Sequence, residues 1–266
     1  MLRGRNLDGK KGCHVMSDVL DTLEALTRAR TDASLWALHC ERMATYGFDR
    51  LIYGFTRYRS GQSLGDPQDW VVLTNHDPAY VGPFIEDGHY FHAPMLRGAL
   101  ENTGACSWSW LAELAGSERM TAGEKRILEF NRSMGVTAGY TVSFRSVSER
   151  TRGAIALTAR RGLDQAEVDR IWARHGQEIL VLNNVFHLKL LTLPYSGARK
   201  LTSRQREVLQ WVGDGKTTQD IAVLLDLTPA TIEKHLRLAR DALDVETTAQ
   251  AVLKAAFYNQ MFVVET

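Results

Sequence analysis

Cysteine and long apolar runs are both scarce in this chain of 266 residues, and their scarcity excludes several classes of protein. The three cysteines, Cys13, Cys40 and Cys106, are too few and too scattered for a disulfide framework or a zinc site. No apolar run reaches the roughly 20 residues that cross a bilayer. The N-terminal stretch MLRGRNLDGKKGCHV is basic but lacks the apolar core of a signal peptide. We therefore expect a cytoplasmic protein.

Motifs for catalysis are also missing. The sequence contains no G-x-S-x-G and no phosphate-cradling glycine loop. His76, His89 and His92 have no acidic or cysteine residue at a matching ligand spacing. We therefore predict no metal site, no cofactor and no enzyme. A lactone hydrolase that uses these histidines is the alternative from another functional class, and loss of lactone turnover in His89→Ala would support it.

The chain divides at LPYSGARK, residues 193–200, where Pro, Ser and Gly separate two helical patterns. Its length allows two compact domains or one large one, and this break favours two. We predict a disordered tail over 1–16 and, from Ser17 as N-cap, a first domain over 17–193. A linker over 194–200 and a second domain over 201–266 follow.

Helical and strand-like segments alternate in the first domain. Helical patterns cover roughly 17–30, 33–45, 78–88, 91–100, 110–115, 121–134 and 164–191. Strand-like runs cover 50–58, 69–75, 138–146 and 153–161, with ACSW as a possible fifth. This order predicts an α+β fold in which one central antiparallel sheet has helices on both faces, an α-β-α sandwich.

The second domain contains four helical segments, at about 202–213, 217–225, 229–243 and 247–258. Thr202 and Thr228 occupy N-cap positions, and Pro229 takes the first helical position. Gly215 follows the first helix, where a left-handed cap is expected. The predicted order of helix, tight turn and helix is that of a helix-turn-helix unit.

The third of these helices has two different faces. Its buried face consists of Ile232, Leu236, Ala239 and Leu243, at spacings of 4, 3 and 4. Its outer face consists of Ala230, Glu233, Lys234 and Arg237. Such an outer face suits a recognition helix in the major groove of DNA, with Lys216, Thr217 and His235 on phosphates. A helical dimerisation or capping domain with a solvated charged face is the alternative.

Charge does not decide between these two interpretations. The whole chain has 32 Lys and Arg and 31 Asp and Glu, for a net charge of +1. From Arg199 onward, nine basic residues are balanced by nine acidic ones. Because phosphate neutralisation supplies most nonspecific affinity, we expect modest electrostatic binding that depends on dimerisation.

The stretch LTSRQREVLQWVGDGKTTQDIAVLLDLTPATIEKHL closely resembles the DNA-binding module of LuxR-type transcription regulators. The resemblance extends over more than forty residues in register. The positions that match are Leu201, Thr202, Arg204, Glu207, Val208, Leu209, Trp211, Gly215, Lys216, Ile221, Ala222, Thr228, Thr231, Ile232 and His235. Gln205, Asp220 and Thr248 depart from the usual Glu, Glu and Arg. The resemblance implies DNA contacts by Lys216, Thr217, Ala230, Thr231, Glu233, Lys234, His235 and Arg237.

The first domain lacks the early acidic pair of a phospho-receiver, and instead resembles the acyl-homoserine-lactone-binding domain of quorum-sensing LuxR proteins. That family has Tyr-x3-Trp-x3-Tyr-x8-Asp-Pro and a later Trp. The same spacing gives His76, Tyr80, Phe84, Ala93-Pro94 and Trp108. The stretch GVTAGYTVSF, with Gly135 and Gly139, is similar to the family's glycine-flanked strand, and GAIALTARR to the strand on the pocket floor.

The resemblance implies a buried lactone whose amide and two carbonyls each need a partner. In the family, the Asp accepts from the amide, the Trp donates to the lactone carbonyl and the Tyr donates to the acyl carbonyl. Here Tyr80 or His76 can donate, but Ala93 cannot accept. Either His92, Thr158 or a backbone carbonyl replaces the Asp, or the signal is a different small apolar molecule, or no ligand binds. The implied ligand contacts are His76, Tyr80, Phe84, Tyr90, Ala93, Trp108 and Thr158.

Taken together, the two resemblances predict a ligand-responsive transcription regulator of quorum sensing. Its expected partners are an N-acyl-homoserine lactone, promoter DNA and a second copy of the chain. The candidate dimer surfaces are the long helix over 164–191 and the last helix, which contains Ala251, Val252, Ala255, Phe257 and Tyr258.

Overall fold

The computed structural model describes residues 8–60, 63–146, 148–194 and 199–261. The chain divides into two compact units, Met1–Leu191 and Thr192–Thr266. The linker that the sequence predicts over 194–200 includes residues 195–198, which lie outside the described residues.

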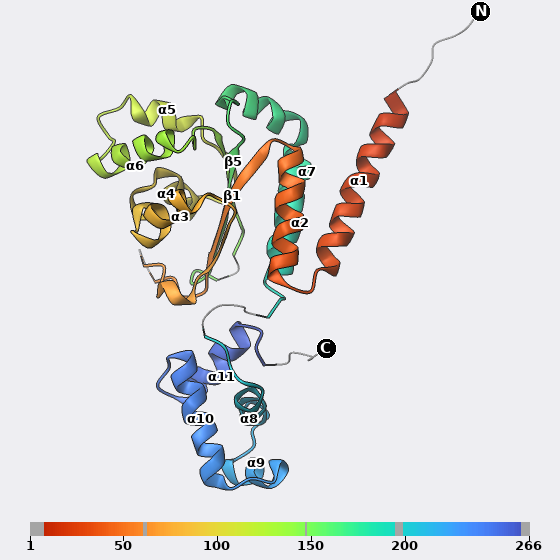
Figure 1. Ribbon diagram of the computed structural model, residues 1–266, viewed down its shortest axis with the longest axis vertical. Helices are drawn as coiled ribbons and strands as arrows, with labels where there is room; N and C mark the ends of the chain where they lie inside the picture. Colours follow the sequence, from red (N-terminus) through yellow and green to blue (C-terminus); the bar gives the residue numbers. More distant parts are fainter. Residues whose placement is uncertain (1–7, 61–62, 147, 195–198, 262–266) are drawn as a thin grey trace, which may run out of the picture. The chain divides into compact units, whose positions relative to one another are not determined.

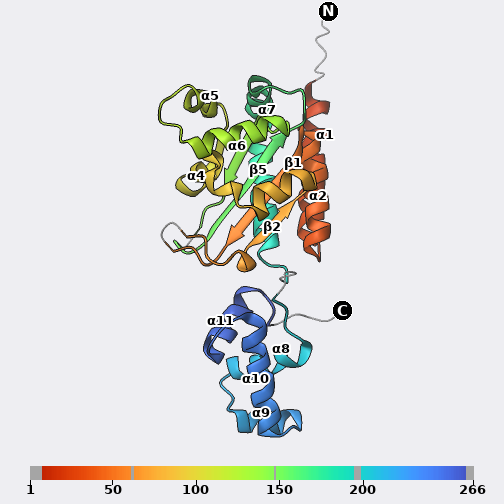
Figure 2. The ribbon, with the colours of Figure 1, turned by 60° about the vertical axis from the view of Figure 1, so that its left-hand side comes forward.

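The N-terminal unit is built on one five-stranded sheet, as the sequence predicts. The strands are β1 (Phe48–Thr56), β2 (Val71–Thr74), β3 (Gly104–Ser107), β4 (Gly139–Ser143) and β5 (Arg152–Ala159). Their order is β2-β1-β5-β4-β3, and every neighbouring pair is antiparallel. The possible fifth strand is β3 at the sheet edge. Figure 2 shows β1, β2 and β5 side by side.

Helices cover both faces of this sheet, which confirms the predicted α+β sandwich (Figure 1). One face packs against α2 (Asp32–Thr45) and α7 (Gln165–Leu190), with α1 (Asp8–Arg28) outside them. The other side contains α3 (Pro78–Val81), α4 (Pro94–Glu101), α5 (Trp110–Ala115) and α6 (Ala122–Ser133).

A core of fully buried side chains lies between the sheet and α7. Along β1, Leu51 and Tyr53 are fully buried, while Ile52 and Gly54 are only half-buried. This alternation follows from the period of two along a strand, which points neighbouring side chains to opposite faces. Phe186 of α7 is also fully buried against Tyr53, with ring centroids 5.4 Å apart. The α7 face of the sheet is therefore solidly packed, and the opposite face is more open.

The first helix is longer than the sequence predicts. Helix α1 begins at Asp8, so Ser17 lies within the helix rather than at its N-cap. The predicted disordered tail over 1–16 is therefore helical from Asp8, and residues 1–7 lie outside the described residues. The stretch over 8–16 has no proline, which would end a helix, and its two glycines, Gly9 and Gly12, weaken a helix without ending it.

A single helix predicted over 78–88 is instead divided in two. Helix α3 ends at Val81, and a wider π-helical turn, η2 (Gly82–Glu86), follows it. Pro83 accounts for the change, because it has no N–H to continue the regular ladder of bonds. A 3₁₀ turn, η3 (His89–His92), then leads to Pro94, the first residue of α4.

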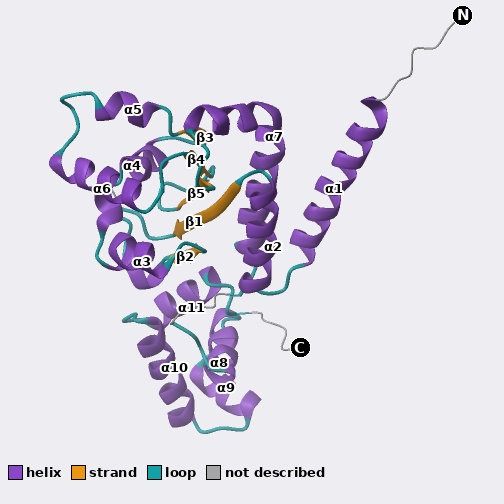
Figure 3. Cartoon of the chain, turned by 45° about the horizontal axis from the view of Figure 1, so that its top comes forward, coloured by secondary structure: helices purple, strands orange, loops and turns teal. Residues whose placement is uncertain are grey.

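The C-terminal unit consists of α8 (Ser203–Gly213), α9 (Thr218–Leu225), α10 (Pro229–Leu243) and α11 (Thr248–Phe257), as the sequence predicts (Figure 3). Thr202 and Thr228 are N-caps whose hydroxyls accept backbone N–H bonds. Gly215 follows α8 with φ of 81°, the left-handed region that favours glycine. Local residue chemistry therefore sets the boundaries of these helices.

Candidate ligand cavity and DNA-reading helix

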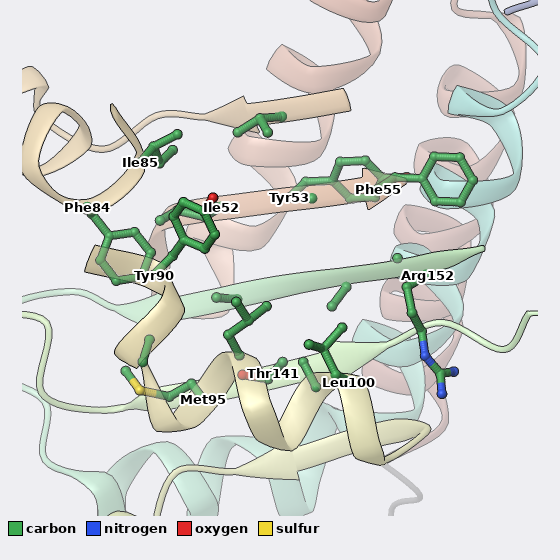
Figure 4. Close-up of a pocket in the computed structure, with 18 of the residues that line it drawn as sticks. Ile52, Tyr53, Phe55, Phe84, Ile85, Tyr90, Met95, Leu100, Thr141 and Arg152 are labelled. Carbon is green, nitrogen blue, oxygen red and sulfur yellow. The ribbon is translucent and has the colours of Figure 1, made fainter. Parts of the chain in front are cut away.

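An apolar cavity of about 170 Å³ lies on the open face of the sheet. Figure 4 shows its lining between the strands and the α4 segment, with Phe84, Tyr90 and Met95 at one end. Among the predicted ligand contacts, the residues that line it are Tyr80, Phe84, Tyr90, Ala93, Trp108 and Thr158. His76 does not line it.

The cavity exists because the sheet presents small side chains there. Gly54 of β1 pairs with Ala154 of β5, and both line the cavity together with Ala156. Ala154 and Ala156 are half-buried, whereas the intervening Ile155 is fully buried on the other face. Small residues at alternate positions leave space above the strands that larger ones would fill.

Tyr80 closes one end of the cavity as part of a buried polar group. Its hydroxyl donates to Oδ1 of Asn131 at 2.9 Å, and its ring stacks on His76 with centroids 4.6 Å apart. Burial lowers the pKa of His76 to about 4, so this ring is neutral. Nε2 of His76 and Nδ2 of Asn131 are buried with no hydrogen-bond partner in the described part of the chain. His76 therefore lies behind Tyr80 and not against the cavity.

Trp108 forms a second wall and depends on a glycine. Its indole N–H donates to Oγ1 of Thr141 at 2.8 Å, and only 4% of the residue is exposed. A Cβ atom at Gly139 would lie 2.3 Å from the carbonyl oxygen of Leu157 and 2.8 Å from the Trp108 ring. Only glycine therefore lets the ring approach β4 so closely.

Ala93 and Thr158 differ in the chemistry they offer the cavity. Ala93 is 3% exposed and supplies only a methyl group. Thr158 of β5 is 1% exposed, and its hydroxyl has no hydrogen bond to any described residue. The Tyr90 hydroxyl is likewise without a bond to the described residues. The hydroxyls of Thr158 and Tyr90 are therefore available for hydrogen bonds to a ligand in the cavity. His92, the other predicted replacement for the Asp, is not in the lining.

The predicted DNA-reading helix, α10, has the two faces that its spacing indicates. Ile232, Leu236, Ala239 and Leu243 are buried. Lys234 is exposed and has no ion pair within the described residues. Arg237 is exposed and pairs with Asp241 at 3.0 Å, while Oε1 of Glu233 accepts a hydrogen bond from Thr218. Lys234 is therefore the free basic group on this face.

The remaining predicted DNA contacts surround the same helix. Lys216 and Ala230 are exposed, and His235 is half-buried. The hydroxyl of Thr217 caps α9 and bonds Oδ2 of Asp220 at 2.7 Å. The Thr231 hydroxyl lies 2.9 Å from that of Thr228. The hydroxyls of Thr217 and Thr231 thus already form hydrogen bonds at the N-termini of α9 and α10.

Two family profiles match this chain, and together they cover both units. Residues 31–190 match the autoinducer binding domain, and residues 199–255 match the bacterial regulatory proteins of the luxR family. The chain belongs to the LuxR family of transcription regulators. Members of this family are regulators and not enzymes, so the hydrolase alternative is wrong.

Relatives of this LuxR-family chain agree with that assignment. It is 25% identical over 240 residues to the transcriptional activator protein AnoR of Acinetobacter nosocomialis, which covers 88% of this chain and 95% of AnoR. It is 25% identical over 192 residues to the quorum-sensing regulator RhlR of Pseudomonas aeruginosa, which covers 68% and 78%.

Solved structures share the fold of this LuxR-family chain. Escherichia coli SdiA in complex with octanoyl-rac-glycerol is 15% identical, covers 98% of this chain and 100% of SdiA, and has a TM-score of 0.52. CepR2 of Burkholderia cenocepacia is 17% identical, covers 66% and 94%, and has a TM-score of 0.50.

The ligand contacts that the resemblance implied leave out most of the cavity wall. The lining residues not named among them include Ile52, Gly54, Trp70, Val72, Met95, Leu100, Val136, Thr141, Arg152, Ala154 and Ala156. The alternation of small residues in GAIALTA was a usable signal, because it marks a strand face without bulk. Arg152 had no signal in the sequence, since a charged residue at a strand start is ordinarily solvated.

The described residues contain no group of three or more His, Cys, Asp and Glu side chains placed to hold a metal ion. Among the helices built from them, none combines the length and the apolar character that crossing a bilayer requires.

Proposed function

We propose that this LuxR-family protein binds an N-acyl-homoserine lactone in the apolar cavity and that binding controls promoter recognition by α10. The observation that carries the proposal is the cavity itself, lined by Tyr80, Trp108 and Thr158, in a chain that also holds a helix-turn-helix unit. An acyl chain would bury its apolar surface against the small floor of the sheet.

The lactone head requires the polar groups at this end of the cavity. Trp108 and Tyr80 donate hydrogen bonds to Thr141 and Asn131, so a carbonyl of the ligand would have to replace one of these two acceptors. Without a carboxylate at Ala93, the amide N–H would donate to the hydroxyl of Thr158 or of Tyr90. These hydrogen bonds to the ligand would offset the free energy lost when its amide and carbonyl groups leave water.

A different small amphiphile is the second candidate, and Ala93 is the observation that favours it. The related fold of SdiA was solved in complex with octanoyl-rac-glycerol, a molecule without a lactone ring. A ligand lacking an amide N–H would need no acceptor at Ala93.

We infer that the ligand acts by stabilising a dimer that binds DNA. Val181 and Leu188 of α7 are 41% and 63% exposed, and Leu253 and Phe257 of α11 are 55% and 40% exposed. Ala251, Ala255 and Tyr258, which the sequence suggested for the α11 dimer surface, are instead buried. The exposed apolar side chains of the two helices support a dimer surface there. A ligand that binds only the folded dimer shifts the population towards that dimer. The two C-terminal units of a dimer then bind DNA more tightly than one, because binding of the first raises the effective concentration of the second.

A series of lactones with short to long acyl chains tests the proposal. We expect at least one of them to raise the melting temperature and to tighten binding of the target promoter, which chromatin capture from the host would supply. No change in either quantity across the series would contradict lactone gating.

Thr158→Val tests the proposed amide acceptor. The change is nearly isosteric and removes one hydroxyl, so we expect lactone affinity to fall about tenfold while the fold persists. Isothermal titration calorimetry measures the effect. Thr56→Val shows what the loss of a structural hydroxyl does in the same cavity, because the Thr56 hydroxyl at the far end donates to the carbonyl of Leu64 at 2.8 Å and accepts from the N–H of Tyr58. Equal losses in both variants would count against the role of Thr158.

Lys234→Ala tests the DNA-reading face. Loss of this exposed charge should weaken promoter binding about tenfold and leave ligand affinity unchanged. Fluorescence anisotropy with labelled promoter DNA measures it. Lys125→Ala, an exposed lysine on α6 of the other unit, removes the same charge and should have no effect. Wild-type affinity in Lys234→Ala would show that the face has been misassigned.

A further inference from the structure

Arg152 is the only charged side chain in the described lining of the apolar cavity. It begins β5 and is half-buried, and its Nε atom is buried with no hydrogen-bond partner among the described residues. None of the ion pairs formed by the described residues includes it. A guanidinium with a buried N–H needs an acceptor, because an unpaired buried donor costs free energy.

The other N–H donors of the cavity already have acceptors in the protein. The indole N–H of Trp108 donates to Thr141, and that of Trp70 donates to the carbonyl of Leu64 at 2.8 Å. The Tyr80 hydroxyl donates to Asn131. Arg152 therefore stands apart as a cationic donor that faces the cavity without an anion.

Arg152 lies at the opposite end of the cavity from the proposed lactone site. Figure 4 shows it at one end of the lining, with Phe84 and Tyr90 at the other. Along β5, Arg152 and Thr158 are separated by six residues, or roughly 20 Å at the rise of a strand. Ala154 and Ala156 lie between them on the same face of the sheet, so this part of the face has no bulky side chains. An extended acyl chain lying over the two alanines would run from Thr158 towards Arg152.

We propose that Arg152 determines ligand specificity by binding a carboxylate at the far end of the acyl chain. The inference rests on the proposed function, since the same cavity holds the ligand, and it specifies an acyl chain with a terminal carboxylate. The guanidinium matches a carboxylate with two parallel N–H···O bonds. Because Arg152 is half-buried, the carboxylate keeps part of its hydration, which limits the desolvation cost.

A matched pair of synthetic lactones tests this assignment. Both have the same chain length, but one chain ends in a methyl group and the other in a carboxylate. In calorimetric titrations of the full chain, we expect the carboxylate-ended lactone to bind about tenfold more tightly. Arg152→Met keeps an apolar stem and removes the charge, and it should reverse the preference. Arg152→Lys should retain part of it. A preference for the methyl-ended lactone in the unaltered protein, or an unchanged ratio in Arg152→Met, would overturn the assignment.

A second pair of probes separates this inference from lactone binding. A dicarboxylic acid monomethyl ester has the chain and carboxylate without a lactone, and the dimethyl ester lacks the charge. If both lactones fail but the monoester binds and depends on Arg152, the lactone is wrong and the carboxylate site stands. If both lactones bind equally, the cavity function stands and the carboxylate site is wrong. Failure of all four probes would overturn both.

Discussion

Phe186→Ala is expected to lower the free energy of unfolding of the autoinducer-binding unit by about 3–5 kcal/mol. Phe186 is fully buried in α7, and its ring stacks on His39 with centroids 4.2 Å apart. It also meets Tyr53 edge-on. Truncation would remove these contacts and leave a cavity that the packed α7 face cannot close. Denaturant titration followed by tryptophan fluorescence measures the loss.

The control for this prediction is Phe91→Ala, which removes the same ring from η3. Phe91 is 67% exposed, so its loss should change the free energy of unfolding by no more than about 0.5 kcal/mol. Comparable destabilisation in the two variants would contradict the position of the core between α7 and the sheet.

Stability should fall steeply as the pH drops from 6.5 towards 4, because three buried histidines are held neutral. Burial lowers the pKa of His39, His76 and His187 to about 4, from an ordinary value of 6.5. Above pH 6.5 neither state binds these protons, and the full stability is present. Between these two pKa values, the histidines are protonated in the unfolded chain but stay neutral in the folded one. Each histidine then lowers the free energy of unfolding by about 1.4 kcal/mol for each pH unit.

Urea titrations at several pH values across this window measure the slope. His187→Phe is the informative variant, because the ring of His187 stacks on Phe144 with centroids 4.0 Å apart. It removes one titrating group, so the slope should become shallower by about 1.4 kcal/mol per pH unit. The variant also loses the contact between Nδ1 of His187 and the Tyr53 hydroxyl at 2.8 Å, a change that is the same at each pH. An unaltered slope would exclude His187 as a source of the pH dependence.

The C-terminal unit was almost fully predictable from sequence. The N-caps of α8, α9 and α10 are Thr202, Thr217 and Thr228, whose hydroxyls accept backbone N–H bonds. Pro229 is the first residue of α10, and Gly215 follows α8 in the left-handed region. The buried face of α10 also follows from spacing alone. Short-range chemistry specifies such elements, because a cap or a helical turn involves residues at most four apart.

The N-terminal unit was less predictable where its elements bend or extend. The strand segments followed from alternating apolar residues, but the break at Pro83 and the start of α1 at Asp8 did not. The sequence also indicated Tyr80 and Trp108 as pocket residues through motif spacing. It could not reveal that Tyr80 donates to Asn131, fifty-one residues away, or that His76 lies behind it.

By itself, the sequence determined that this protein has an α+β domain with one antiparallel sheet and a helix-turn-helix unit, because hydrophobic periodicity and helix capping depend on neighbouring residues. Only the tertiary structure decided that a cavity exists and that Arg152 faces it. The cavity floor needs Gly54 beside Ala154, residues one hundred positions apart, and their pairing depends on the register of β1 against β5. Register is set by burial of the whole sheet face, which no local pattern contains.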